Sequence, residues 1–211
     1  TLMLNFWGLV FGFPAPILLA LMINEVKRKG FAKLVQTITY MPHFISMVIV
    51  AGMIRELVST SGPINSLIVS MGGEPIQFIS LPQWFTTIFV TSGIWQGLGW
   101  NSIIYMSALS AVDPALHEAA VVDGASKFQR IRYIDFPAIL PTVVIMLILD
   151  TGKIMNVGFE KVYLMQNAMN LSTSEIISTY VYKIGIQQGK YSLSTAINLF
   201  NSIINFILLL S

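Results

Sequence analysis

The sequence EAAVVDGASKFQRIRYIDFP, from Glu118 to Pro137, holds most of the charge in the middle of a very apolar chain. Just ahead of it, Asp113 and Pro114 form a strong helix start. An Asp side chain can accept hydrogen bonds from free N–H groups of the first turn, and Pro has no N–H to leave unpaired there. Gly124 predicts the end of this helix, because glycine takes a left-handed backbone conformation without steric cost.

A second helix is predicted after this bend. Ser126 and Gln129 have the spacing of a capping box, and Pro137 then opens the next apolar segment. Residues 113–136 should therefore form two short helices joined by a glycine-centred bend. Spacing alone leaves open an ordinary loop that only connects two apolar segments. The small side chains of Ala119 and Ala120 and the rigid bend favour a projection that another protein approaches closely.

The composition indicates a membrane protein. The 211 residues are 55% hydrophobic and only 10% charged, whereas a soluble domain carries about a quarter charged residues. The absence of cysteine excludes disulfides, thiolate metal sites and cysteine nucleophiles. A net charge of +2 does not indicate a nucleic-acid partner. Because both ends of the sequence lie in apolar runs, we expect a fragment of a longer subunit.

Five apolar stretches are long enough, or nearly so, to cross the hydrocarbon core, which takes about 20 helical residues. They are Thr1–Ile23, Leu34–Ile54, Trp84–Val112, Pro137–Val157 and Tyr191–Ser211. Pro14 and Pro16 predict a kink in the first. Membrane-barrel strands are shorter and alternate in polarity, and these stretches do neither. The alternative of buried helices in a large soluble protein does not suit five such runs. The predicted fold class is all-α, a polytopic transmembrane helical bundle.

The charges of the connecting loops orient these spans. Two short loops are basic, and they lie two membrane crossings apart, so the positive-inside rule places both in the cytoplasm. Their basic residues are Lys27, Arg28, Lys29 and Lys33 in the first loop and Lys127, Arg130 and Arg132 in the second. Connections on the other side contain two further predicted helices, a short one from Gly62 to Val69 and an amphipathic one from Ser172 to Lys183.

The polar insert resembles the EAA loop of the membrane subunits of binding-protein-dependent ABC importers. That pattern reads EAA, three residues, G, then a distal I and LP. It is matched by Glu118, Ala119, Ala120, Gly124, Ile134 and Pro137, and by the frequent Asp123, Ala125 and Ser126. The chain departs from it at Phe128, where Trp is common, and at Phe136, where Leu usually precedes the Pro.

The resemblance covers nearly the whole chain. The segments Gly30–Ser46 and Gly93–Pro114 resemble sugar permeases, and Val157–Phe200 is similar to the LplB-type polysaccharide and oligosaccharide branch. It implies a MetI-like, type I importer permease of about six spans, of which five are visible and one N-terminal span is missing. Residues 1–211 would form one N-terminally truncated permease domain, with residues 113–136 as its cytoplasmic coupling loop. The residues that it assigns to ATPase coupling are Glu118, Ala119, Ala120, Asp123, Gly124, Ala125 and Pro137.

The resemblance also implies partners. Two ATP-binding cassette subunits would bind ATP and Mg, so this chain would hold no cofactor and would not itself be an enzyme. A second, different permease subunit would pair with it in the lipid of the bacterial inner membrane, and an extracytoplasmic binding protein would deliver the saccharide. The segment Gly185–Tyr191 comes near a phosphate-binding Walker loop, but it has the wrong spacing and lacks the hydroxyl after Lys190.

Polar residues within spans are costly and tend to face a cavity, which makes them candidates for the substrate path. They are Trp95, Gln96, Trp100, Asn101, Asp150, Lys153 and Asn156. The alternative is helix packing, with Asp150 and Lys153 paired one turn apart. His43 and His117 lack metal-ligand partners at helical spacing, so we take them as packing or loop residues, with no metal site.

Two other functions stay open. A permease for a peptide, an amino acid or an inorganic anion would share the EAA loop. A membrane-embedded enzyme would need a paired acid and base or a metal cluster on facing helices, and His43 and Asp150 are too isolated in the sequence to supply one.

Overall fold

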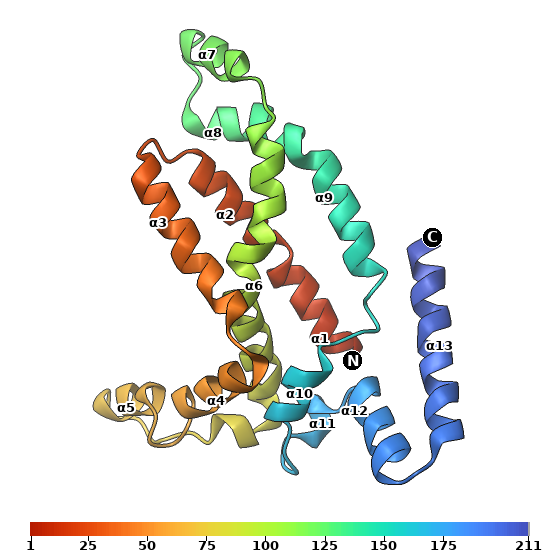
Figure 1. Ribbon diagram of the computed structural model, residues 1–211. Coiled ribbons are helices and arrows are strands. Elements are labelled where there is room, and N and C mark those ends of the chain that lie inside the picture. Colours follow the sequence, from red (N-terminus) through yellow and green to blue (C-terminus); the bar gives the residue numbers. More distant parts are fainter. Residues whose placement is uncertain (211) are drawn as a thin grey trace. The chain divides into compact units, whose positions relative to one another are not determined.

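The computed structural model describes residues 1–210, which are helical or irregular without any strand (Figure 1). The predicted all-α fold class is confirmed. Within these residues, three helical segments are long and apolar enough to cross a membrane, or four if one broken pair counts as a single span. They are Leu2–Asn24, Lys127–Thr151 and Tyr191–Leu210, and the broken pair is Lys29–Phe44 with Met47–Leu57. Ser211, the last residue of the predicted fifth span, lies outside the described residues.

The first span contains a π-helical segment in place of a simple proline kink. Helix α1 (Leu2–Trp7) passes into π-helix η1 (Gly8–Gly12), and α2 (Pro14–Asn24) follows. A proline inside a helix has no N–H to donate and its ring crowds the preceding turn. The wider π-helical turn, which ends two residues before Pro14, accommodates both effects.

The second predicted span, Leu34–Ile54, is not one continuous helix. Helix α3 (Lys29–Tyr40) ends in the short 3₁₀-helix η2 (Met41–Phe44), and α4 (Met47–Leu57) starts anew. Pro42 weakens helical hydrogen bonding at this point because it has no N–H. The side chain of Ser46 then caps α4 by accepting a hydrogen bond from the backbone N–H of Ile49 at 3.4 Å.

The third predicted span is the long helix α6 (Pro82–Ser110), which has 29 residues. It is not among the three apolar segments, although its length suffices to cross a bilayer. Its glycines, hydroxyl residues and amides lower its hydropathy. Polar groups at membrane depth are tolerated where they face protein or a cavity, so α6 fits an interior position better than a lipid-facing one.

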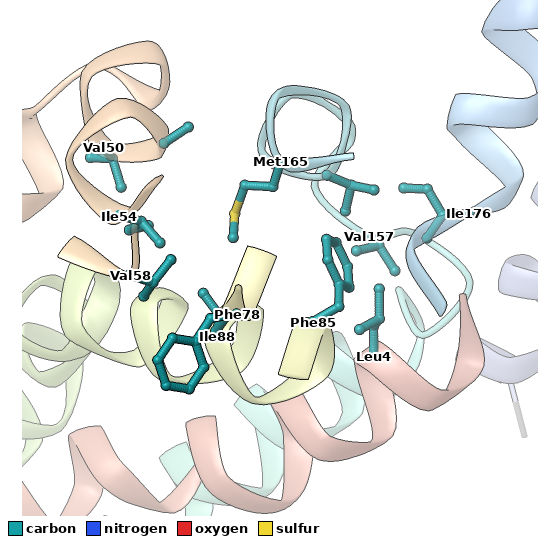
Figure 2. Packing of buried hydrophobic residues seen from close by; sticks show 12 residues of the cluster. Leu4, Val50, Ile54, Val58, Phe78, Phe85, Ile88, Val157, Met165 and Ile176 are labelled. Atoms are coloured by element: carbon teal, nitrogen blue, oxygen red, sulfur yellow. The ribbon is translucent and has the colours of Figure 1, made fainter. Parts of the chain in front are cut away.

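The described chain packs as two compact units. Unit 1 comprises Thr1–Gly8, Ile45–Gly93 and the residues from Gly152 onward. Its core joins α1, α4, α6 and α10 (Phe159–Met165), and Figure 2 shows the buried side chains of Leu4, Phe85 and Val157 near one another. The helix predicted after Gly62 is confirmed as α5 (Pro63–Ser70), which is followed by Gly72 in the left-handed conformation at φ +87°.

Unit 1 also contains a buried cation. The ammonium group of Lys161 on α10 donates to the carbonyl oxygen of Phe89 at 2.9 Å and lies 4.7 Å from the centre of its ring. Burial disfavours the charged form and lowers the pKa of Lys161 to about 8. The carbonyl and the aromatic face together offset the loss of hydration.

Unit 2 comprises Leu9–Phe44 and Ile94–Thr151. Its core brings α2 and α6 together with α9 (Phe136–Thr151); the buried members are Ile17, Ala20, Leu21, Tyr105, Leu109 and Ile139. On another side of α6, Gly99 is buried so close to α3 that a Cβ atom there would collide with the Thr39 carbonyl group and the Tyr40 ring. The close approach of α3 and α6 therefore depends on the missing side chain.

Candidate functional site

The loop that the sequence singled out begins with helix α7 (Pro114–Val122), as predicted. The carboxylate of Asp113 accepts a hydrogen bond from the backbone N–H of Ala115 at 2.9 Å. At the other end, Gly124 has φ +76°, and the N–H groups of Gly124 and Ala125 donate to the carbonyl oxygens of Val121 and Ala120 at 3.1 and 2.9 Å. This pair of bonds is the Schellman motif, and it confirms the glycine-centred end of the helix.

The capping box that starts the second helix is confirmed too. The hydroxyl of Ser126 accepts from the backbone N–H of Gln129 at 3.3 Å, and the side-chain oxygen of Gln129 accepts from the backbone N–H of Ser126 at 2.7 Å. The predicted end of this helix before Pro137 is wrong. Helix α8 (Lys127–Arg130) continues through π-helix η4 (Ile131–Asp135) into α9.

The reason lies in the π-helical segment, which ends two residues before Pro137 and changes the hydrogen-bond register near the proline, which cannot donate. The same arrangement precedes Pro14 in the first span. As a result, the predicted span Pro137–Val157 begins earlier and ends earlier, since one helical segment runs from Lys127 to Thr151. Only Ala125 and Ser126 thus separate the bend at Gly124 from this helical segment.

The residues that match the EAA pattern lie on α7 and in the bend. Glu118, Ala119, Asp123 and Gly124 are exposed, while Ala120 and Ala125 are half-buried. No residue of α7 is buried. Large apolar side chains are nevertheless exposed here, and they are Leu116, Val121, Val122 and Phe128. An exposed apolar surface beside small residues is typical of a protein-docking surface.

At the base of the loop, a buried carboxylate joins three segments, and the sequence analysis missed it. Oδ1 of Asp135 lies 3.3 Å from Nε2 of His117 on α7 and accepts a hydrogen bond from Nδ2 of Asn24 at 3.2 Å. Beside it, Arg130 pairs with Glu25 at 3.0 Å. The available signal was an acidic residue two positions before the proline that opens an apolar span.

The predicted substrate-path residues of α6 do not form one surface. Gln96 and Trp100 are four residues apart and share a helix face, whereas Trp95 and Asn101 point in other directions. The Trp100 ring stacks on His43 at 4.4 Å. This contact bears out the packing role that we expected for His43.

The remaining predicted path residues lie at and after the end of α9. Asp150 is in its last turn, and Lys153 and Asn156 belong to the turn that follows. The side-chain oxygen of Asn156 accepts a hydrogen bond from the amide of Asn201 at 3.0 Å. Asn201 belongs to the last helix, α13 (Tyr191–Leu210).

An asparagine stripe on α13 is the second feature that the sequence analysis missed. Asn198, Asn201 and Asn205 are three and four residues apart and therefore share one face. Asn205 accepts a hydrogen bond from the backbone N–H of Met155 at 3.3 Å. Their spacing in an otherwise apolar run was the available signal, because amides within a span face protein or a cavity.

Residues 12–211 match the family model described as the inner membrane component of binding-protein-dependent transport systems. Two curated proteins of Bacillus subtilis (strain 168) are each 45% identical to the chain: protein LplB over 210 residues, and the polygalacturonan/rhamnogalacturonan transport system permease protein YteP over 211 residues. These matches cover 99% and 100% of the chain. The chain spans 66% of the length of each relative, just under two thirds.

A solved structure is similar as well. It is a bacterial alginate ABC transporter in complex with a periplasmic protein that holds an alginate pentasaccharide. Its matching chain superimposes with a TM-score of 0.96 at 44% identity, covering 99% of this chain and 73% of that one. A second crystal structure of an alginate importer gives the same values.

Proposed function

The chain belongs to the family of inner-membrane components of binding-protein-dependent transport systems, and we propose that it is the permease subunit of an ATP-driven importer of oligosaccharides or polysaccharides. It is embedded in the membrane by several helices. In the proposed assembly it spans the bacterial inner membrane and forms part of the path for a saccharide. Separate cytoplasmic subunits bind ATP and Mg and hydrolyse the ATP.

The loop geometry is the observation that carries this proposal. A projecting helix with exposed Glu118 and Ala119 is fixed at its start by Asp113 and at its end by the turn at Gly124. The small side chain of Ala119 lets a partner backbone approach, and Glu118 can pair with a basic group of the ATPase. The helical segment from Lys127 to Thr151 would then carry movement of the ATPase into the membrane.

The proposed partners follow from the same family. Two ATPase subunits would dock from the cytoplasm, and a second, different permease subunit would complete the path. An extracytoplasmic binding protein would deliver the cargo on the other side. The alginate transporter supports this last contact, because its structure includes a periplasmic protein with bound pentasaccharide.

For the cargo, we propose an acidic saccharide. One relative is a polygalacturonan/rhamnogalacturonan transport system permease. The similar solved structure is of a transporter that is involved in the import of alginate, an acidic polysaccharide. Lys153 could attract an anionic sugar, and amide groups such as those of Asn198 and Asn201 suit sugar hydroxyls. A peptide, an amino acid or an inorganic anion remains the alternative cargo.

The test is reconstitution of the complete transporter in proteoliposomes with its binding protein. We expect the ATPase subunits to co-purify with the permease, and we expect ATPase activity and uptake to rise with an alginate or galacturonate oligosaccharide. Stimulation by a neutral oligosaccharide alone would reject the acidic cargo. Stimulation only by a peptide or an inorganic anion would reject the saccharide class, and failure of the ATPase to co-purify would reject the importer.

Asn201→Leu is expected to lower uptake about tenfold, because it removes one hydrogen-bonding group from the proposed path. The measurement is the initial rate of saccharide uptake at saturating binding protein, with the amount of assembled transporter kept equal. Ser202→Ala on the same helix is the control, since its hydroxyl donates to the carbonyl oxygen of Asn198 within α13. Equal uptake by Asn201→Leu and Ser202→Ala would contradict a role of the stripe in the path.

A further inference from the structure

Five polar side chains join three segments at the base of the coupling loop, all within unit 2. The segments are the end of α2, helix α7, and the stretch from α8 through η4. The side chains are Asn24, Glu25, His117, Arg130 and Asp135. We call this set the base cluster.

Asp135 is the centre of the base cluster. Its side chain is 1% exposed. Its Oδ1 lies next to Nε2 of His117 and accepts a hydrogen bond from Nδ2 of Asn24. Its Oδ2 is buried and accepts no hydrogen bond from any described residue. Burying a carboxylate oxygen without a hydrogen-bond donor reduces stability, because the hydrogen bonds that water made to it are not replaced. An apolar residue would serve better if this position had only to pack, so the cost points to a role for the carboxylate.

Helix α7 has little else to hold it against the membrane segments. It buries no residue, and among the described side-chain hydrogen bonds and ion pairs the one that leaves α7 is that of His117. Its other attachments are the chain itself at Asp113 and at the bend around Gly124. Movement imposed on α7 would otherwise be lost in these two connections.

The other side of the base cluster leads to the first span. Asn24 ends α2, and Glu25 follows it and pairs with Arg130 of α8. Ile131 of η4 packs against the unit 2 core, which includes Ile17 and Leu21 of α2. The start of the segment 127–151 is therefore fixed to the end of α2 by both polar and apolar contacts.

We propose that His117 and Asp135 are positioning residues that make α7, the start of the segment 127–151 and the end of α2 move as one body. A push on the loop would then reach two membrane spans, the one that follows the loop and the one at the start of the chain. This inference rests on the proposed function, because it assigns a route to the movement that the ATPase imposes.

The first test compares saccharide taken up per ATP hydrolysed in the reconstituted transporter. His117→Ala removes the donor, and we expect the ratio to fall about tenfold, the order of effect of losing a hydrogen bond to a charged group. His117→Gln keeps an N–H donor in reach of Asp135 and should stay within about threefold of the wild type. Lys183→Gln is the matched control, because it breaks an exposed 2.9 Å ion pair with Glu175 outside unit 2.

A wild-type ratio for His117→Ala would overturn the proposal, and so would a His117→Gln variant as defective as His117→Ala. The proposed function fails separately, if the wild-type transporter itself shows no ATP-driven saccharide uptake.

The second test measures movement without activity. The chain has no cysteine, so spin labels can be placed at Met22→Cys on α2 and Val122→Cys on α7, both of which are exposed. With His117 present, we expect ATP binding to leave the distance between the labels unchanged. With His117→Ala, we expect ATP binding to shift or broaden the distribution of distances between the two labels. A shift of the same size with His117 present would contradict the single moving body.

Discussion

Gly124→Val is expected to let the transporter hydrolyse ATP while uptake falls at least tenfold. Gly124 has φ +76°, a conformation that costs a residue with a side chain about 1–3 kcal/mol, and a β-branched residue suffers most. No neighbouring atom lies within 4 Å of a Cβ placed there, so the strain belongs to the backbone alone. The bend relieves it by opening, and α7 then leaves the orientation in which movement of the ATPase reaches the segment 127–151.

Two variants separate this effect from general instability. Gly124→Asn should keep most of the uptake, because asparagine tolerates the left-handed conformation. Gly72→Val introduces the same kind of strain at φ +87°, also without a neighbour within 4 Å, but after α5 in unit 1. We expect its uptake per ATP to stay normal. Normal uptake by an assembled Gly124→Val transporter would refute the bend as the coupling element.

Gly99→Leu is expected to destabilise the subunit and to reduce the yield of assembled transporter severely. Its first side-chain carbon would already collide with the Thr39 carbonyl group and the Tyr40 ring. Backbone atoms of a packed helix cannot rotate away as a side chain can, so α3 would have to separate from α6. Overpacking of this kind costs about 1–3 kcal/mol or more. The measurement is thermal unfolding of the detergent-solubilised complex, followed by size-exclusion chromatography.

Gly97→Ala is the matched control for this variant, because it adds a Cβ to the same helix two residues earlier. That atom would meet only the side-chain amide of Asn101, at 3.1 Å, and this amide can move. We expect Gly97→Ala to unfold within a few degrees of the wild type. A Gly99→Leu protein with the stability of Gly97→Ala would show that α3 and α6 do not need the close approach.

The caps and the bend of the coupling loop could be predicted from the sequence because short-range hydrogen bonds determine them. Asp113, Gly124, Ser126 and Gln129 act on backbone groups within a few residues, and each acts as predicted. The same local reasoning failed where two rules compete. At Pro137, the sequence predicted the start of a separate span, but a π-helical segment joins the preceding helix to that span.

The helix predicted from Ser172 to Lys183 failed in a related way. The structure has α11 (Leu171–Ser174) and α12 (Ile177–Tyr182), with an extended backbone at Glu175 and Ile176 between them. A side chain near this break forms a hydrogen bond with a residue far away in the sequence. The hydroxyl of Thr173 donates to the carbonyl oxygen of Pro82 at 3.0 Å. Helical spacing alone carries no information about such contacts.

Interactions across long sequence separations were out of reach for the same reason. The base cluster joins Asn24 to Asp135, and the asparagine stripe meets the turn after α9 through Asn201 and Asn156. One sequence shows which residues are polar, but their partners are set by the packing of helices far apart in the chain. The roles of the EAA residues and of the substrate-path residues remain predictions.

Apart from the contact of His117 with Asp135, the hydrogen bonds that cap and bend residues 113–129 join residues at most five positions apart. This stretch therefore needs nothing from the last helix, α13, to reach its form. During synthesis, these local caps and the bend can therefore begin to form before α13 has been inserted into the bilayer.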